Sequence, residues 1–227
     1  MQYTASTTSS QIDQGLREYM TGIYSFMASG LGITALTAYG VSAVPALTAL
    51  FLGGPQAFVF MFAPLVMVLV MSFGMEKFSA NTLRLMFFAY SALMGISLST
   101  IFLTFTGISI ATTFLITVSA FAGLSIYGIT TKRNLSAMGT FLLMGLIGLL
   151  VAMIANIFIA SSALAFAVNI IGVLIFAGLT AYDTQNLQQL YLTGNTTEKL
   201  SIMGALSLYL NFINLFMFLL NLLGNRE

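Results

Sequence analysis

The sequence predicts an all-α membrane protein with seven transmembrane helices, and three observations carry this prediction. The chain has 227 residues, of which 59% are hydrophobic and 6% are charged, and its mean hydropathy is +1.00. Soluble domains carry about 25% charged residues, so this chain has too few charges to cover a water-exposed surface. It also contains seven long apolar runs, and charged and uncharged connections alternate between them.

Each apolar run is near the length of roughly 20 residues that a spanning helix needs. The expected spans are Met20–Ala43, Ala57–Met75, Leu83–Phe105, Ile108–Tyr127, Met138–Ala160, Ala163–Tyr182 and Ser201–Leu223. Turn-forming residues separate these runs in chain order. They are Pro45 with Gly53-Gly54-Pro55, Ser79-Ala80-Asn81, Gly107, Thr131 to Asn134, Ser161-Ser162 and Gly194-Asn195.

Three parts of the chain are expected. Residues 20–223 form the transmembrane domain, and residues 224–227 form a short C-terminal tail. Residues 1–19 form a polar N-terminal tail with a short amphipathic segment, in which Ile12, Leu16 and Tyr19 oppose Asp13, Arg17 and Glu18. We interpret this segment as a surface helix that leads into the first span. It does not match a cleavable signal, because the apolar run that follows is too long.

The charges between the spans predict the orientation of the chain in the membrane. Arg17 lies before the first span, and Glu76, Lys77 and Arg84 lie between or beside the second and third spans. Lys132 and Arg133 lie between the fourth and fifth spans, and Glu198 and Lys199 precede the seventh. The other three connections carry no charge. Positive residues concentrate on the cytoplasmic side of membrane proteins. The N-terminus is therefore expected in the cytoplasm and the C-terminus outside.

Composition excludes several kinds of chemistry. The chain has no cysteine, which removes disulfides, thiolate metal sites and thiol nucleophiles. It has no histidine, which removes the usual general base and the usual zinc ligand. Its net charge is +1, so no basic face for nucleic acid is expected. We expect no metal site, no cofactor and no enzymatic activity.

The seventh span has a polar face. Ser207, Asn211, Asn214 and Asn221 recur at spacings of four, three and seven, which places them on one side of a helix. Such a face should point into protein or water rather than into lipid. The last span is therefore expected to be a central helix surrounded by the others. Two interpretations stay open: these side chains hold neighbouring helices by hydrogen bonds, or they line an ion path.

Asp183 is the strongest candidate functional residue. It is the one acidic residue attached to the end of a long apolar run, and an ionisable group at the rim of the hydrocarbon is costly to keep. Burial and the negative end of its helix would favour the neutral acid, whereas a nearby cation would favour the charged form. A carboxylate under these opposing influences could change charge near neutral pH and serve as a pH switch. The cytoplasmic cations are Lys77, Arg84, Lys132 and Arg133. The alternatives are a structural salt bridge and a hydrated interfacial acid.

Three segments resemble a known family. Gly178-Leu-Thr-Ala-Tyr-Asp183-Thr-Gln and Leu206-Ser-Leu-Tyr-Leu-Asn-Phe-Ile-Asn-Leu-Phe216 are similar to the C-terminal signature of the Bax inhibitor-1 family, also called the transmembrane Bax inhibitor motif family. Gly15-Leu-Arg-Glu-Tyr-Met20 resembles its bacterial branch. The resemblance implies six helices around a central seventh, and a pH-sensitive calcium leak across the membrane.

The resemblance also implies roles for individual residues. An aspartate at the position of Asp183 pairs with a second aspartate in the last span, and a basic residue from the end of span two contacts the pair. The second position here is Asn211, and the basic partner would be Lys77 or, by a looser match, Arg84. A carboxylate and an amide cannot share a proton as two carboxylates do, so the pH dependence is expected to weaken or shift.

Calcium is expected as a permeant ion rather than a tightly bound one. It prefers six to eight oxygen ligands, and the six acidic residues are spread over the chain. Weak binding suits a permeation path, because an ion must leave as easily as it enters. The lining candidates, besides Asn211 near the middle of the span, are Ser207, Asn214 and Asn221.

A membrane regulator and an intramembrane protease are the alternatives to a leak. A non-conducting regulator could bind another membrane complex, such as a protease or a death-regulating protein, in stress or cell-death control. An intramembrane aspartyl protease would need two carboxylates that share a proton, and no second acid lies within a predicted span. The expected location is the bacterial inner membrane, with a eukaryotic endomembrane as the alternative. The expected partners are the lipid bilayer, calcium and, for the regulator, another membrane protein.

Overall fold

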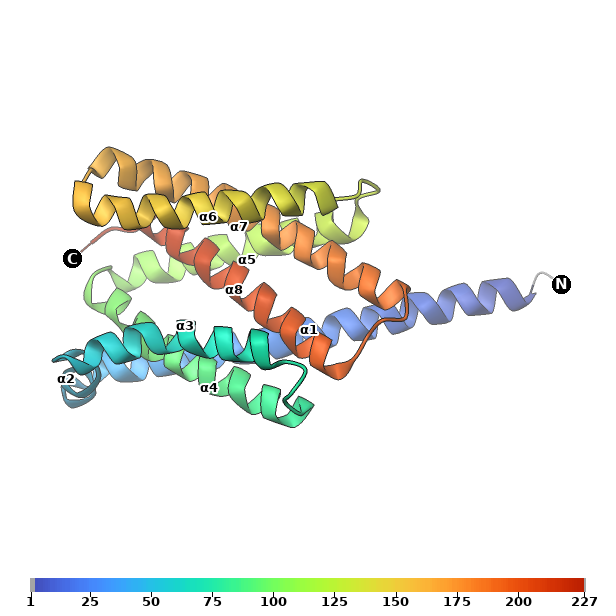
Figure 1. Ribbon diagram of the computed structural model, residues 1–227, viewed down its shortest axis with the longest axis horizontal. Helices are drawn as coiled ribbons and strands as arrows, with labels where there is room; N and C mark the ends of the chain where they lie inside the picture. Colours follow the sequence, from blue (N-terminus) through green and yellow to red (C-terminus); the bar gives the residue numbers. More distant parts are fainter. Residues whose placement is uncertain (1–2, 227) are drawn as a thin grey trace. The chain divides into compact units, whose positions relative to one another are not determined.

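The structure is a computed structural model that describes residues 3–226, with side chains described from residue 13 onward. The helices follow one another along the chain and are labelled in Figure 1. They are α1 (Tyr3–Ala43), α2 (Pro45–Leu52), α3 (Gln56–Gly74), α4 (Ala80–Leu98), the 3-10 helix η1 (Ser99–Leu103), α5 (Gly107–Thr130), α6 (Ser136–Ile159), α7 (Ser162–Leu192) and α8 (Glu198–Leu223). The described residues contain no β-strand, so the all-α prediction is confirmed.

Seven helices in the described chain are long and apolar enough to cross a membrane, as predicted. Their bounds are Asp13–Ala43, Gln56–Gly74, Ala80–Leu103, Gly107–Thr130, Ser136–Ile159, Ser162–Leu192 and Glu198–Leu223. Most of these bounds lie within a few residues of the expected ones, which is the usual spread for helix ends. The side of the membrane that each end faces stays a prediction.

The predicted N-terminal tail continues directly into the first span as helix α1. Residues 1 and 2, and the side chains through Ile12, lie outside the described part of the chain. From Asp13 onward the amphipathic pattern is visible. Leu16 and Tyr19 are half-buried, whereas Asp13, Arg17 and Glu18 are exposed.

Helix α7 corrects one expectation about Asp183. The sixth span was expected to end at Tyr182, which would place Asp183 at the negative end of its helix. The polar residues from Thr184 to Gln189 were expected to follow as a helical tail, and α7 does continue through them, to Leu192. The influence of a helix dipole falls off within the last turn. The negative end of α7 therefore lies near Leu192, and its charge does not act at Asp183.

The described chain divides into two compact units. Unit 1 comprises the chain through Leu98 together with Asn186–Leu206. Its core forms where α1 packs closely against α4. The Phe26 and Phe87 rings stack with their centroids 4.5 Å apart, and Thr34 Oγ1 donates a hydrogen bond of 2.9 Å to the Ser91 carbonyl. A Cβ at Gly95 would lie 2.6 Å from the Thr34 carbonyl oxygen, so a small residue is needed for this approach.

Unit 2 comprises Ser99–Gln185 and the chain from Ser207 onward. Among its described residues, two apolar clusters contribute to its core. The larger joins α6, α7 and α8 through Leu142, Leu149, Val168, Ile175, Phe176, Leu179, Leu215 and Phe218. The smaller joins η1, α5 and α8 through Ile101, Phe105, Ile110, Phe216 and Leu220. The backbone of α7 lies close to α8, because a Cβ at Gly172 would lie 2.7 Å from the Phe218 ring.

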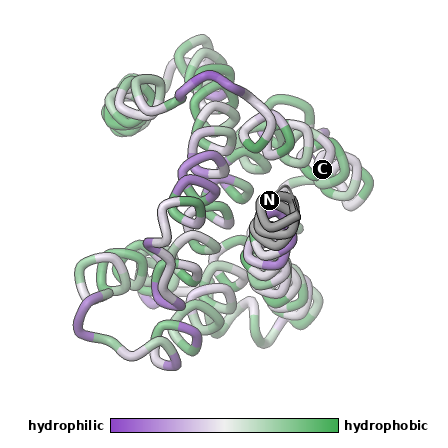
Figure 2. Tube along the Cα trace, turned by 90° about the vertical axis from the view of Figure 1, so that its right-hand side faces the viewer, coloured by the Kyte–Doolittle hydropathy of each residue, from purple (hydrophilic) through white to green (hydrophobic). Residues whose placement is uncertain are grey.

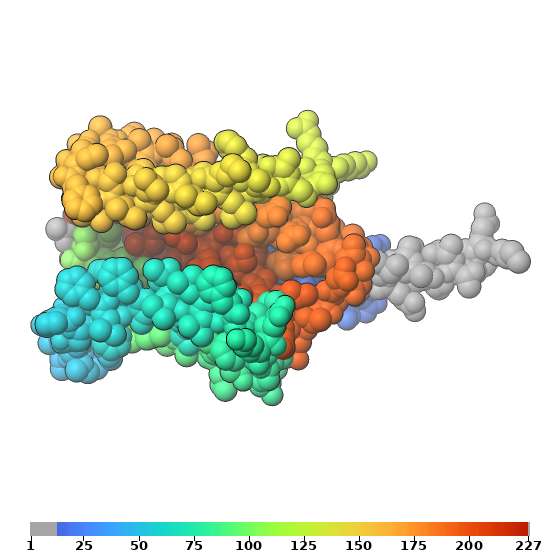
Figure 3. Space-filling view, in the orientation of Figure 1, coloured from blue at the N-terminus to red at the C-terminus, as the bar shows by residue number. Residues whose placement is uncertain are grey.

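The outward faces of the helices are apolar, as a lipid solvent requires. Most helical turns are coloured white or green in Figure 2, and the purple, hydrophilic segments are few. Helices α3 and α6 bury only 11% of their most apolar stretch, and Phe73 and Phe158 are 84% and 82% exposed. Each of these two helices is visible at the molecular surface in Figure 3. Helix α8 has the largest buried share of the seven, 56%, as expected for the helix predicted to be central.

Candidate functional site

Asp183 lies half-buried on α7, in unit 2, and is bonded to two side chains of α8. Its Oδ2 atom accepts a hydrogen bond of 2.6 Å from Ser207 Oγ and one of 2.7 Å from Asn211 Nδ2. Both distances are short, as expected for hydrogen bonds to a carboxylate. The two bonds tie α7 to α8 at one atom of the carboxylate.

The sequence of α8 explains why two donors reach the same oxygen. Ser207 and Asn211 are four residues apart, so they lie one above the other on a single helix face. Asn211 is 4% exposed, between the buried residues Leu208 and Phe212. A buried amide must find a partner, because an unsatisfied polar group in an apolar interior costs several kcal/mol. The Asp183 carboxylate is that partner.

The other two residues of the predicted polar face, Asn214 and Asn221, bond to their own helix. Asn214 Nδ2 donates to the Leu210 carbonyl at 2.8 Å, and Asn221 Nδ2 donates to the Met217 carbonyl at 2.9 Å. Asn214 is half-buried and Asn221 is exposed. The structure therefore brings Ser207 and Asn211 to Asp183, whereas the lining of an ion path by the polar face stays a prediction.

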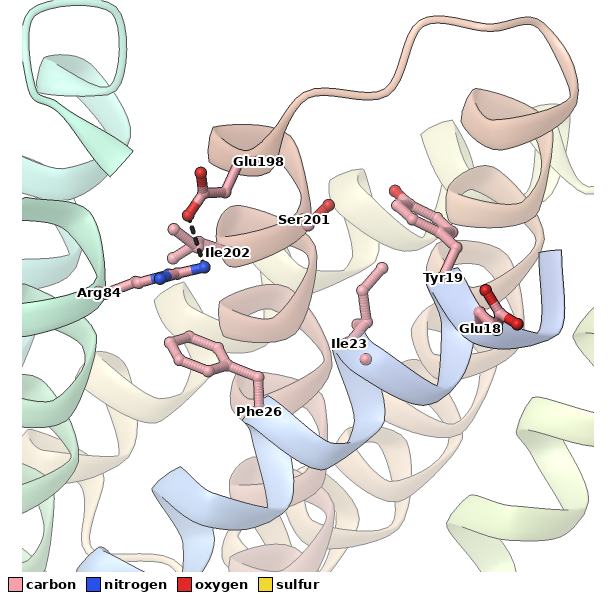
Figure 4. A pocket seen from close by; sticks show the side chains of 9 residues that line it. Glu18, Tyr19, Ile23, Phe26, Arg84, Glu198, Ser201 and Ile202 are labelled. Carbon is pink, nitrogen blue, oxygen red and sulfur yellow. Dashed lines mark ion pairs between the residues drawn. The ribbon is translucent and has the colours of Figure 1, made fainter. Parts of the chain in front are cut away.

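The two basic candidates, Lys77 and Arg84, belong to unit 1. Arg84 forms an ion pair with Glu198 at the start of α8, with 2.6 Å between Nη2 and Oε1 (Figure 4). The pair borders a pocket of about 250 Å³ that is also lined by Tyr19 and Phe26. Both partners are half exposed, so the pair is expected to stabilise the fold by about 1 kcal/mol or less. The pairing of Lys77 or Arg84 with Asp183 stays a prediction.

Gln185 is a residue of this site that the sequence reasoning missed. Its Nε2 donates to the Arg133 carbonyl at 2.9 Å, and its Oε1 accepts from the Leu135 backbone N–H at 2.8 Å. The side chain is 6% exposed. It therefore fastens the loop that carries Lys132 and Arg133 to α7, two residues beyond Asp183. The sequence marks Gln185 as part of a polar tail but gives no sign that it meets a loop 50 residues away.

The site offers one carboxylate, one hydroxyl and one amide. Within the described residues, no three acidic side chains lie close enough together to hold a metal ion. A single carboxylate with two neutral oxygen-bearing neighbours can take up a proton, and it can contact a passing cation weakly. The site can therefore serve proton uptake or weak cation binding.

The seven apolar helices and the carboxylate between two of them define a multi-pass helical membrane protein. The sequence profile described as "Inhibitor of apoptosis-promoting Bax1" matches residues 16–227. The chain therefore belongs to the Bax inhibitor-1 family, and the resemblance found in its C-terminal segments is confirmed.

Bacterial relatives are similar along nearly their whole length. An uncharacterized protein of Caulobacter vibrioides is 46% identical, with 95% of this chain and 92% of the relative covered. The protein RP147 of Rickettsia prowazekii is 43% identical, with 99% and 97% covered. The inner membrane protein YbhL of Escherichia coli K12 is 43% identical, with 94% of each chain covered. The protein is accordingly a multi-pass protein of the inner membrane.

Proposed function

We propose that the protein is a pH-sensitive calcium leak channel gated around Asp183. Family membership establishes a multi-pass membrane protein, and the calcium leak is the part that we propose. The observation that supports the proposal is the pair of hydrogen bonds from Ser207 and Asn211 to Asp183 Oδ2. They make the contact between α7 and α8 depend on a group that can gain or lose a proton.

The proposed gate works through the strength of these two bonds. Hydrogen bonds to a charged carboxylate are roughly twice as strong as those between neutral groups. Protonation of Asp183 would remove the charge and weaken the hold of Ser207 and Asn211 on α7. A change of pH would then shift the balance between two arrangements of α7 and α8, provided that they differ in this contact.

The same residues suit calcium as a permeant ion. Calcium binds oxygen ligands, and the site presents the Asp183 carboxylate, the Ser207 hydroxyl and the Asn211 amide. These oxygens are too few to hold the ion tightly, so it could be released as readily as it is bound.

The proposal is tested by calcium entry into vesicles that contain the purified protein and a calcium-sensitive dye. We expect faster entry than into protein-free vesicles, and a changed rate for Asp183→Asn. The matched control is Asp13→Asn, which makes the same chemical change at the other aspartate of the chain, on the exposed face of α1. We expect that variant to conduct as the unmodified protein does.

The same experiment distinguishes the leak channel from the alternative function, a non-conducting regulator that binds another membrane complex. The observation in its favour is the broad exposed apolar surface of α3 and α6, which another membrane protein could cover. If folded protein admits calcium no faster than empty vesicles do, the leak proposal fails and the regulator takes its place. The proposal does not include proteolysis, because the partner of Asp183 on α8 is the amide of Asn211 rather than a second carboxylate.

A further inference from the structure

A cavity of about 280 Å³ lies in unit 2, lined by residues of α6, α7 and α8 and by Arg226 near the C-terminal end of the described chain. Its polar lining comes from Asn156, Asn169, Asn221 and Arg226. Asn169 precedes Asp183 by fourteen residues on the same helix, which is about 21 Å at 1.5 Å per residue. The cavity is therefore distinct from the Asp183 site and is independent of the function proposed above.

The backbone around Arg226 is fixed by contacts with the start of α5. The Thr106 N–H donates to the Asn225 carbonyl at 3.1 Å, and the Asn225 N–H donates to Ser109 Oγ at 3.0 Å. The guanidinium carbon of Arg226 lies 5.6 Å from the centroid of the Phe105 ring. A guanidinium held over an aromatic face keeps its N–H groups at its edge, where they can bind an anion in a forked geometry.

The polar groups of the cavity offer more donors than acceptors; Asn221, whose Nδ2 donates to a carbonyl of its own helix, contributes its Oδ1 as an acceptor. Asn156 uses its Oδ1 to accept from the Ser161 N–H at 3.0 Å, and its Nδ2 remains available as a donor. Arg226 contributes further donors and no acceptor. Within the described part of the chain, Asn169 has no hydrogen-bond partner, and no acidic side chain lines the cavity. A donor-rich cavity with one positive charge favours an anion and disfavours a cation.

The surroundings indicate that the anion belongs to a lipid. Ile157 and Phe158, near the end of α6, are 76% and 82% exposed, as expected of apolar side chains that face the hydrocarbon of a bilayer. Met153 and Val168 give the cavity an apolar wall. A free phosphate would leave this wall uncovered, whereas a phospholipid could place its phosphate at Arg226 and its glycerol and upper acyl chain against the wall. We propose that this cavity binds the phosphate headgroup of an anionic phospholipid.

The test measures binding of short-chain lipids to the full-length protein in detergent by isothermal titration calorimetry. We expect dioctanoyl phosphatidylglycerol to bind at least about tenfold more tightly than dioctanoyl phosphatidylcholine, because a net charge on the headgroup strengthens its hydrogen bonds with the guanidinium. Inorganic phosphate should bind more weakly than phosphatidylglycerol. Equal binding of the two lipids, or of phosphate and phosphatidylglycerol, would overturn the proposal.

Two variants and one control locate the site. Arg226→Gln should weaken phosphatidylglycerol binding by about tenfold, since it removes a charged donor. Asn169→Leu should weaken it less, because it removes a neutral donor. Arg133→Gln makes the same charge change on the exposed α5–α6 loop and should leave binding unchanged. If Arg226→Gln binds as the unmodified protein does, or if Arg133→Gln loses as much affinity, the site is not in this cavity. Circular dichroism checks that each variant is folded.

Discussion

At the scale of single residues, the two hydrogen bonds to Asp183 are unlike the others made by the polar face of α8. They cross between helices, whereas those of Asn214 and Asn221 return to carbonyls of α8 itself. A bond between helices contributes to the association of the helices. A bond to a carbonyl one turn earlier adds little, because that carbonyl is already used by the helix backbone.

This difference predicts unequal effects of two similar substitutions. Asn211→Leu should lower the free energy of unfolding by about 1–2 kcal/mol, because Asp183 loses one of its two donors in a buried setting. Asn214→Leu should lower it by about 0.5 kcal/mol or less. Unfolding by sodium dodecyl sulfate, followed by circular dichroism, measures both. A loss for Asn214→Leu as large as that for Asn211→Leu would contradict the assignment.

Residue patterns predicted part of this site. The spacing of Ser207 and Asn211 places them on one face, and Asp183 stands out as an acid at the end of an apolar run. The partner of Arg84 could not be predicted in the same way. Glu198 lies more than 100 residues away in the sequence. The two residues meet because α4 approaches the start of α8, and no periodic pattern in the sequence indicates this approach.

At the scale of the elements, glycine sets the distance between α5 and α7. A Cβ at Gly128 would lie 2.5 Å from the Ala181 carbonyl oxygen, which belongs to a rigid backbone. Gly123 lies on the same helix, is exposed and has open space around its Cα. The two glycines therefore form a matched pair.

Gly128→Ala should lower the free energy of unfolding by about 1–3 kcal/mol, because the added methyl group forces α5 away from α7. Gly123→Ala should raise it by up to about 1 kcal/mol, because alanine favours the helix and meets no neighbour. The same unfolding assay reports both changes. A lower free energy of unfolding for Gly128→Ala together with a higher one for Gly123→Ala would support the close α5–α7 contact. An increase for both variants would refute it.

The loop between α5 and α6 depends on another residue of α7. Gln185→Ala removes both hydrogen bonds to the loop and should increase its local opening. Trypsin cleaves after lysine and arginine, so cleavage at Lys132 and Arg133 should become several-fold faster. The control is Gln189→Ala, which removes an exposed side chain from the same helix. Equal cleavage rates for the two variants would show that Gln185 does not hold the loop.

The C-terminal end of α7 shows what hydropathy can and cannot predict about a helix. Apolar runs identify the part of a helix that crosses lipid, and they located all seven spans. The continuation of α7 to Leu192 has no apolar signal, because its residues are mainly polar. Glutamine and leucine are good helix formers, so the helix persists beyond the hydrocarbon. Hydropathy alone therefore predicted where the span ends but not where the helix ends.

At the scale of the whole molecule, the orientation in the membrane rests on the alternating charges. The chain has no cysteine, so each engineered cysteine is the only thiol present. In intact spheroplasts, Ser161→Cys should react with a membrane-impermeant maleimide, and Lys132→Cys should react only after lysis. Labelling of Lys132→Cys from outside would invert the predicted topology.

Composition and hydropathy predicted the class and the helix count of the whole molecule because lipid imposes strong limits on any spanning chain. Function is less constrained by these features. The final-span signature identified the family, yet Asn211 stands where the resemblance implies a second aspartate. The structure gives Asn211 a partner in Asp183, and the effect of this amide on the pH response has to be measured.

The most direct test of the central claim is the pH profile of calcium entry into vesicles, measured between about pH 6 and pH 8. The unmodified protein and Asp13→Asn should show the same pH-dependent rate. Asp183→Asn, which cannot change charge, should show a rate that stays flat across this range. A pH profile for Asp183→Asn that matches that of the unmodified protein would contradict the assignment of Asp183 as the switch.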